Sequence, residues 1–299
     1  IGVGLASAVC PMYIAEVSPT PMRGRLVSLN QLSIVVGILG AQIINWLIAE
    51  NVPDNFSNPE ILVSWNGQSG WRWMFWAEAF PAALFLIFVF FIPESPRWLA
   101  VNGMREKARE IFANIGGENN ADAELSQIEL SQQRQLSESG FKGIFKKRYR
   151  FVITLGIIIA VFQQWCGTNV IFNYAQEIFQ GAGFSLNEVM FNIVVTGVAN
   201  LVFTFVAIFT VDKIGRRALM ILGAGGLGLI YLILGACFFM NVSGIMMVIL
   251  VVVAIACYAM TLGPITWVLL SEIFPTKVRG VAMAVATFAL WAGCFKLTY

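Results

Sequence analysis

The sequence contains no histidine, and only 12% of its 299 residues are charged. A soluble domain would carry about a quarter of its residues as charge. Without histidine, the commonest general base, proton shuttle and metal ligand is missing, which excludes histidine-based enzyme mechanisms. The 19 basic and 17 acidic residues leave a net charge of +2, so the composition does not favour a nucleic-acid partner.

The cysteines form no CxxC pair. All five lie inside apolar runs, at Cys10, Cys166, Cys237, Cys257 and Cys294. We interpret them as small buried hydrophobic residues rather than as disulfides or metal ligands. We therefore expect neither a metal site nor a cofactor.

Apolar residues make up 58% of the chain and gather in long stretches with little or no charge. A helix needs about 20 apolar residues to cross a bilayer. Eight spans meet or approach this length, at 1–15, 26–49, 73–93, 151–176, 189–211, twice within 218–271 around the polar turn 241–244, and at 280–295. The sequence therefore predicts an all-α polytopic protein in a lipid bilayer. Because it begins and ends inside apolar runs, we expect a fragment of a longer protein.

Basic residues gather in alternate connections between the spans. In the opposite connections, at 50–72, 181–188 and 241–244, Arg72 is the only basic residue. The side with the basic connections is therefore expected to be cytoplasmic. On that side lies the polar segment 94–150, where apolar residues recur at helical spacing at Ala108, Ile111, Phe112 and Ile115. This spacing predicts amphipathic helices. A disordered linker is the alternative, above all around 116–120 and 131–140.

One pattern occurs twice. Glu-x-x-Pro-Thr-x-x-Arg-Gly begins at Glu16 and again at Glu272, each time between two spans, which indicates two related halves. Membrane proteins with two parallel repeats are candidates for alternating access around a site at mid-membrane. Ion pairs of these acids with Arg23 and Arg279 could hold the halves together in one state. Solvated charges that follow the positive-inside rule are the alternative.

Further motifs accompany the duplicated one. They are Pro11-Met-Tyr13 before the first copy, Pro93-Glu-Ser-Pro-Arg-Trp98, Gln163-Gln164 with Asn169, Val211-Asp-Lys-Ile-Gly-Arg-Arg217, and Gly263-Pro264 with Trp267. As an ordered set they resemble the sugar porters of the major facilitator superfamily, which include bacterial xylose and hexose–proton symporters and glucose carriers.

The resemblance implies a fold of two pseudo-symmetric six-helix halves, truncated at both ends. The chain would cover about helix 4 to helix 11 of that fold. Residues 1–93 would end the N-terminal transmembrane half, 94–150 would form a cytoplasmic loop with amphipathic helices, and 151–299 would belong to the C-terminal half.

A sugar presents hydroxyl groups and an apolar C–H face, so its site should combine amides with aromatic rings. The amides around the weak helical step Gly167-Thr168 fit this chemistry, because discontinuous helices line transporter sites. By resemblance, the substrate contacts are Gln31, Gln163, Gln164, Asn169, Asn173, Trp267 and Trp291. For any intramembrane amide, an interhelical hydrogen bond is the alternative.

Three positions depart from the pattern of the family's xylose carriers. Ile38 and Leu290 stand where those carriers have glutamines, and Asn173 replaces the first of two tyrosines. The substrate could therefore be another hexose, another pentose or a related polyol.

Glu78 is the only acidic residue within a full span. An ionisable group there costs several kcal/mol unless it is paired or functional, so Glu78 is the candidate for proton coupling. A position near the membrane interface is the alternative.

The resemblance also implies a cytoplasmic gate of Glu16, Arg23, Glu94, Arg97, Asp212, Arg216, Arg217, Glu272 and Arg279. The expected function is sugar–proton symport by alternating access in a bacterial inner membrane, with no enzyme activity. A facilitative uniporter and a transporter-like nutrient sensor are the alternatives.

Overall fold

The computed structural model describes residues 2–18, 23–53, 58–135, 147–240, 242, 244–275 and 278–298, and every regular element in these ranges is helical. Seven helical runs are long and apolar enough to cross a membrane: Leu29–Ile48, Asn66–Val89, Arg148–Asn173, Leu186–Thr210, Arg216–Phe239, Ile245–Ile273 and Arg279–Thr298. A shorter apolar helix, α1 (Gly2–Val17), precedes them. These seven runs and α1 correspond to the eight spans expected from the sequence.

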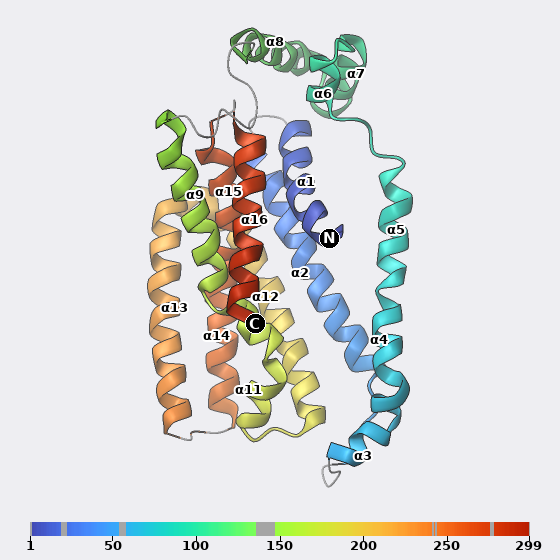
Figure 1. Cartoon of the computed structure of the whole chain (residues 1–299), viewed down its shortest axis with the longest axis vertical. Helices are drawn as coiled ribbons and strands as arrows, with labels where there is room; N and C mark the ends of the chain where they lie inside the picture. Colours follow the sequence, from blue (N-terminus) through green and yellow to red (C-terminus); the bar gives the residue numbers. More distant parts are fainter. Residues whose placement is uncertain are drawn as a thin grey trace.

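The first membrane unit contains α1 and a long helix, α2. After α2 the chain turns back through short helices that follow one another closely. Their bounds are α2 (Arg23–Ile48), α3 (Asn58–Val63), η2 (Asn66–Gly70), α4 (Trp71–Ala77) and α5 (Ala79–Val89). Helix α4 packs on α2, whereas α5 stands apart from the other membrane helices (Figure 1).

The second membrane unit is a compact bundle of long and broken helices. Its elements are α9 (Lys147–Trp165), α10 (Thr168–Asn173), α11 (Ala175–Gly181), α12 (Leu186–Ile214), α13 (Arg216–Phe239), α14 (Ile245–Met260), α15 (Leu262–Ile273) and α16 (Arg279–Thr298). The division predicted at 241–244 is confirmed, because α13 ends at Phe239 and α14 begins at Ile245. Apolar side chains such as Phe179, Met247 and Ile255 fill the bundle, each of them fully buried.

In the sequence, a small helical group stands between the two units. It consists of α6 (Pro96–Val101), α7 (Arg105–Gly116) and α8 (Glu118–Gln135). Its own core includes Phe112 and Leu125. The apolar stripe predicted on α7 is confirmed at Ala108 and Phe112, which are buried, but it is wrong for Ile115, which is 43% exposed. The linker considered around 116–120 is instead the junction of α7 and α8, and most of the second candidate linker, from 136 on, lies outside the described residues.

The order of helix ends gives the bundle two distinct ends. Helices α1, α5, α12 and α15 end, and α2, α9, α13 and α16 begin, at the end that carries α6–α8 (Figure 1). We call this the inner end, since most of the basic connections lie here and the positive-inside rule places them in the cytoplasm. The opposite end is the outer end.

Candidate substrate site

The helix break predicted at Gly167 is present. Helix α9 ends at Trp165, Gly167 has a φ of +81°, and α10 begins at Thr168. Glycine adopts this left-handed conformation without steric cost. A Cβ atom at Gly167 would also lie 3.4 Å from the ring of Tyr231 on α13. The break thus brings the amides on its two sides close together.

Three of the expected sugar contacts form a continuous chain of amide hydrogen bonds. Asn169 Nδ2 donates to Gln164 Oε1, and Gln164 Nε2 donates to Gln163 Oε1 at 2.9 Å. Gln163 Nε2 then donates to the hydroxyl of Tyr258 on α14 at 2.7 Å. Gln163 and Gln164 are only 6% and 8% exposed. Such a network is rigid when each buried polar group has a partner.

Tyr258 was not among the residues singled out from the sequence. It lies in a long apolar run, three residues before Thr261, where α14 gives way to α15. Its bond to Gln163 is an interhelical hydrogen bond, so for Gln163 both interpretations of an intramembrane amide apply at once: it joins two helices and belongs to the amide chain. In the sequence, the break between α14 and α15 was the one signal that could have pointed to Tyr258.

A cavity of about 490 Å³ opens beside the amide chain, between α10–α11 and α16. Its lining consists of Asn173, Tyr174, Trp291, Cys294, Phe295 and Thr298. Cys294 also contacts the amide chain, since Asn169 Nδ2 lies 3.6 Å from its Sγ. Asn173 and Trp291, both expected from the sequence, therefore line the cavity, while Cys294, which was not expected, joins the cavity to the amides.

The remaining expected contacts lie elsewhere. Gln31 is half-buried on α2, in the first membrane unit. Trp267 is 7% exposed within an apolar cluster that it shares with Leu270 and Leu290. Because Leu290 is 1% exposed in that cluster, its departure from the family pattern changes the core next to α16 rather than the cavity lining.

Glu78 occupies the junction of α4 and α5, within the span Asn66–Val89. It therefore lies towards the middle of a membrane-length segment and not at its edge. Its side chain is exposed.

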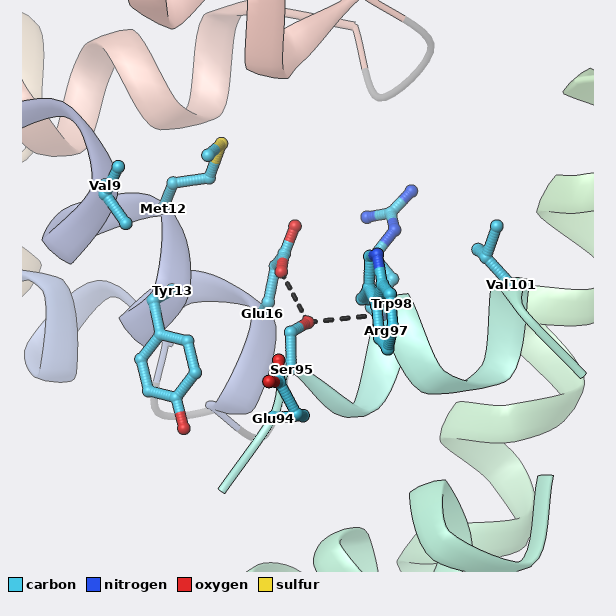
Figure 2. A pocket seen from close by; sticks show the side chains of 9 residues that line it. All are labelled: Val9, Met12, Tyr13, Glu16, Glu94, Ser95, Arg97, Trp98 and Val101. Carbon is cyan, nitrogen blue, oxygen red and sulfur yellow. Dashed lines mark hydrogen bonds between the residues drawn. The ribbon is translucent and has the colours of Figure 1, made fainter. Parts of the chain in front are cut away.

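At the inner end, the first copy of the duplicated motif contacts the start of α6. Ser95 Oγ donates to Glu16 Oε2 at 2.6 Å and accepts from the Trp98 N–H at 3.2 Å (Figure 2). The Tyr13 hydroxyl donates to the carbonyl of Pro93 at 2.7 Å. With Glu94 and Arg97, also expected in the gate, these side chains line a cavity of about 450 Å³.

The second copy makes a comparable contact within its own half. Glu272 Oε1 pairs with Arg216 Nη2 at 3.2 Å, while Arg279 Nε donates to the Phe274 carbonyl at 3.2 Å. Arg217 is exposed. The side chains of Arg23 and Asp212 lie outside the described part of the chain. In the described gate, Glu16 is thus bound to the start of α6, whereas Glu272 is bound to a neighbour in its own half.

Helices α1 and α16 make contacts between the halves, both beside the candidate site and nearer the inner end. Trp291 Nε1 donates to Ser7 Oγ at 3.1 Å. Nearer the inner end, a Cβ atom at Gly280 would lie 3.6 Å from Met12 Sδ. The two halves therefore approach each other beside the candidate site and at its inner side.

A family model described as Sugar (and other) transporter matches residues 1–297. The D-xylose-proton symporter of Escherichia coli strain K12 is 40% identical over 100% of this chain and 58% of its own length. The arabinose-proton symporter of Bacillus subtilis strain 168 is 35% identical over 97% of this chain and 61% of its own length. The chain thus spans about three fifths of these curated relatives.

Solved structures of a sugar transporter are also similar to this chain. The E. coli xylose transporter in a partially occluded inward-open conformation is similar with a TM-score of 0.81 and 38% identity, over 99% of this chain and 60% of that chain. Its inward-open conformation gives a lower TM-score of 0.74. With its membrane-length helices and these relatives, the chain belongs to the sugar transporter family and is part of a multi-pass bacterial membrane protein of the major facilitator fold.

Proposed function

We propose that the protein moves a monosaccharide across the membrane by alternating access, in symport with protons. The observation that carries this proposal is the amide chain Asn169–Gln164–Gln163, which touches the cavity between α10–α11 and α16 through Cys294. The sugar binds in this cavity, and the halves rock around it so that it faces one side of the membrane at a time.

The chemistry of the cavity supports a sugar. An amide offers both donors and an acceptor, as the hydroxyl groups of a sugar require, and Asn169 and Asn173 supply amides at or beside the lining. The rings of Tyr174 and Trp291 offer surfaces for the C–H face of the sugar. The volume of about 490 Å³ falls within the roughly 300–1,000 Å³ of small-molecule sites.

Proton coupling is assigned to Glu78, the exposed carboxyl within the span Asn66–Val89. A carboxyl within a membrane segment marks a proton or ion pathway by default. Two relatives, from E. coli and B. subtilis, are named proton symporters. A glucose facilitated diffusion protein of Zymomonas mobilis is 33% identical, so uniport is the second candidate for the same site.

Uptake by the full-length protein in proteoliposomes tests the proposal. Pentoses, hexoses and polyols are supplied with and without an imposed pH gradient, and Glu78→Gln is measured beside the unchanged protein. Symport predicts accumulation that depends on the gradient and is lost in Glu78→Gln. Equal uptake with and without the gradient would establish uniport instead, and binding without uptake of any sugar would favour a sensor.

A further inference from the structure

Two asparagines hold the chain segment that follows α2 at the outer end. Asn66 of η2 donates through Nδ2 to the Glu50 carbonyl at 2.7 Å and accepts from the Glu50 N–H at 2.9 Å. Asn187 of α12 does the same with Val52, donating to its carbonyl at 2.9 Å and accepting from its N–H at 3.1 Å. Each amide side chain thus satisfies both backbone groups of a single residue.

The two clamps have equal chemistry but different places in the fold. Asn66 and Glu50 are 16 residues apart in the first membrane unit. Asn187 and Val52 are 135 residues apart and belong to different units. The first clamp therefore shapes a connection within one half, whereas the second joins the two halves.

Close contacts between α2 and α12 continue inward from the Asn187 clamp. The rings of Trp46 and Phe191 have centroids 6.1 Å apart. Further inward, α2 and α12 approach closely at Gly197, where a Cβ atom would overlap Gln42 Oε1 and lie 3.1 Å from Leu39 Cδ1. The outer part of the contact between the halves is therefore closed.

We infer that Asn187 is a latch that holds the outer ends of the two halves together whenever the site is closed to the outside. This inference rests on the proposed alternating access, in which halves that rock around a central site must part at the outer end when the site opens outward. Two parallel hydrogen bonds to one backbone residue fix both the distance and the orientation, so they break together. Val52 is 8% exposed and Asn187 is half-buried, which limits the access of water to these bonds in the closed state.

The matched variants Asn187→Ala and Asn66→Ala test the latch. In the full-length protein with its native cysteines replaced by serine, spin labels at Leu62→Cys on α3 and Gln180→Cys on α11 report the separation of the outer ends by pulsed electron paramagnetic resonance. Both positions are exposed. Losing both bonds of Asn187 should raise the ratio of outer-open to outer-closed protein about tenfold, and Asn66→Ala should leave that ratio within about twofold.

Asn187→Asp keeps the acceptor for the Val52 N–H but loses the donor to its carbonyl, so it should raise the ratio about threefold. It also provides a second reading if Asn187→Ala fails to fold. Distances in both Asn187 variants that match the unchanged protein, or an equal opening in Asn66→Ala, would overturn the latch. The distance measurement needs no sugar, so a failure of uptake in every variant would count against the proposed function and not against the latch.

Discussion

At the scale of single residues, Gln164 holds the middle position in the amide chain of the candidate site. It donates to Gln163 and accepts from Asn169, and it is 8% exposed. Removing it takes the hydrogen-bond donor from the buried side-chain carbonyl of Gln163, and it takes the acceptor from the half-buried amide of Asn169, which then keeps only its contact with Cys294. Each group left unsatisfied costs about 1–3 kcal/mol.

Gln164→Ala is therefore expected to weaken sugar binding by about 100-fold, because the variant loses the bond that orients Asn169 beside the cavity and disorders the amides on either side. Isothermal titration of the full-length protein with its transported sugar measures the change. Gln176→Ala is the control, since Gln176 is exposed on α11 and is not one of the three amides of the chain. Equal affinities of Gln164→Ala and Gln176→Ala would exclude the amide chain from the site.

The amides could be predicted from the sequence, but their partners could not. A glutamine pair within an apolar span is conspicuous because placing an amide in a membrane costs free energy unless the amide is hydrogen-bonded or functional. A tyrosine or a cysteine in the same setting is unremarkable, since both pack as partly apolar side chains. Only the fold shows that Tyr258 and Cys294 contact the amide chain, because it brings α14 and α16 against the broken helix.

At the scale of elements, the break between α9 and α10 depends on one glycine. Gly167 has a φ of +81°, a conformation that costs an L-residue roughly 1–2 kcal/mol. Gly225 of α13 has ordinary helical geometry, and a Cβ atom there would meet nothing within 4 Å.

Gly167→Ala is expected to destabilise the full-length protein by about 1–2 kcal/mol and to lower uptake, whereas Gly225→Ala should be neutral or stabilising by up to about 1 kcal/mol. Thermal unfolding in detergent and proteoliposome uptake measure the two effects. If both alanine variants behave alike, the left-handed turn is not what positions Asn169 opposite Gln164.

The contact of α7 with α8 has a charged side. Arg109 Nε bonds to Asp122 Oδ1 at 2.8 Å and Arg109 Nη2 bonds to Oδ2 at 3.2 Å. The hydrogen bond from Arg109 lowers the pKa of the Asp122 carboxyl below its usual value. Because the pKa is lower in the folded state, the contribution is present above the unfolded pKa of about 3.9 and is lost as the pH falls through the lowered value.

We expect α7 and α8 to lose protection against hydrogen exchange below about pH 4, after correction for the intrinsic rate at each pH. Asp122→Asn should remove this part of the pH dependence and leave the exchange of α12 unchanged. The effect should be small, because both side chains are solvated. An identical pH profile in the variant would show that the pair does not stabilise the contact.

Element positions could be predicted well where apolar length or periodicity decides them. The spans and the turn 241–244 follow from the cost of placing charge or unpaired backbone groups in a bilayer. Burial along α7 was predicted less well, because Ile115 continues the apolar spacing but is 43% exposed. Which apolar residue ends a stripe depends on the neighbouring element and not on the spacing.

At the scale of the whole molecule, the duplicated motif predicted two related halves, and the alternation of basic connections predicted the two ends of the bundle. Contacts between the halves could not be predicted in the same way. Asn187 and Val52 lie 135 residues apart, in a helix start and a short connection that show no periodic pattern. The duplicated acids illustrate the same limit, because the sequence does not say which neighbours they bind.

The last prediction concerns the second of these acids. Glu272 pairs with Arg216 at the inner end, where its side chain is 48% exposed, so the pair contributes at most about 1 kcal/mol. Helix α15 carries Glu272 and packs on α2 as well as on α9, so a looser α15 should weaken the inner contact between the halves. Glu272→Gln is then expected to favour the inward-open state by about two- to fivefold.

The rate at which a maleimide from the inner side labels Cys294, the cysteine in the cavity lining, measures this shift in full-length protein whose other native cysteines are serine. The rate should rise two- to fivefold in Glu272→Gln, and the transported sugar should slow it. Glu129→Gln is the matched control, because Glu129 pairs with Arg105 at 3.3 Å within α6–α8. An unchanged labelling rate in Glu272→Gln would mean that the pair fixes α13 to α15 without taking part in the gate. An equal rise of the labelling rate in Glu129→Gln would mean that the loss of a surface charge, and not the loss of this pair, causes the effect.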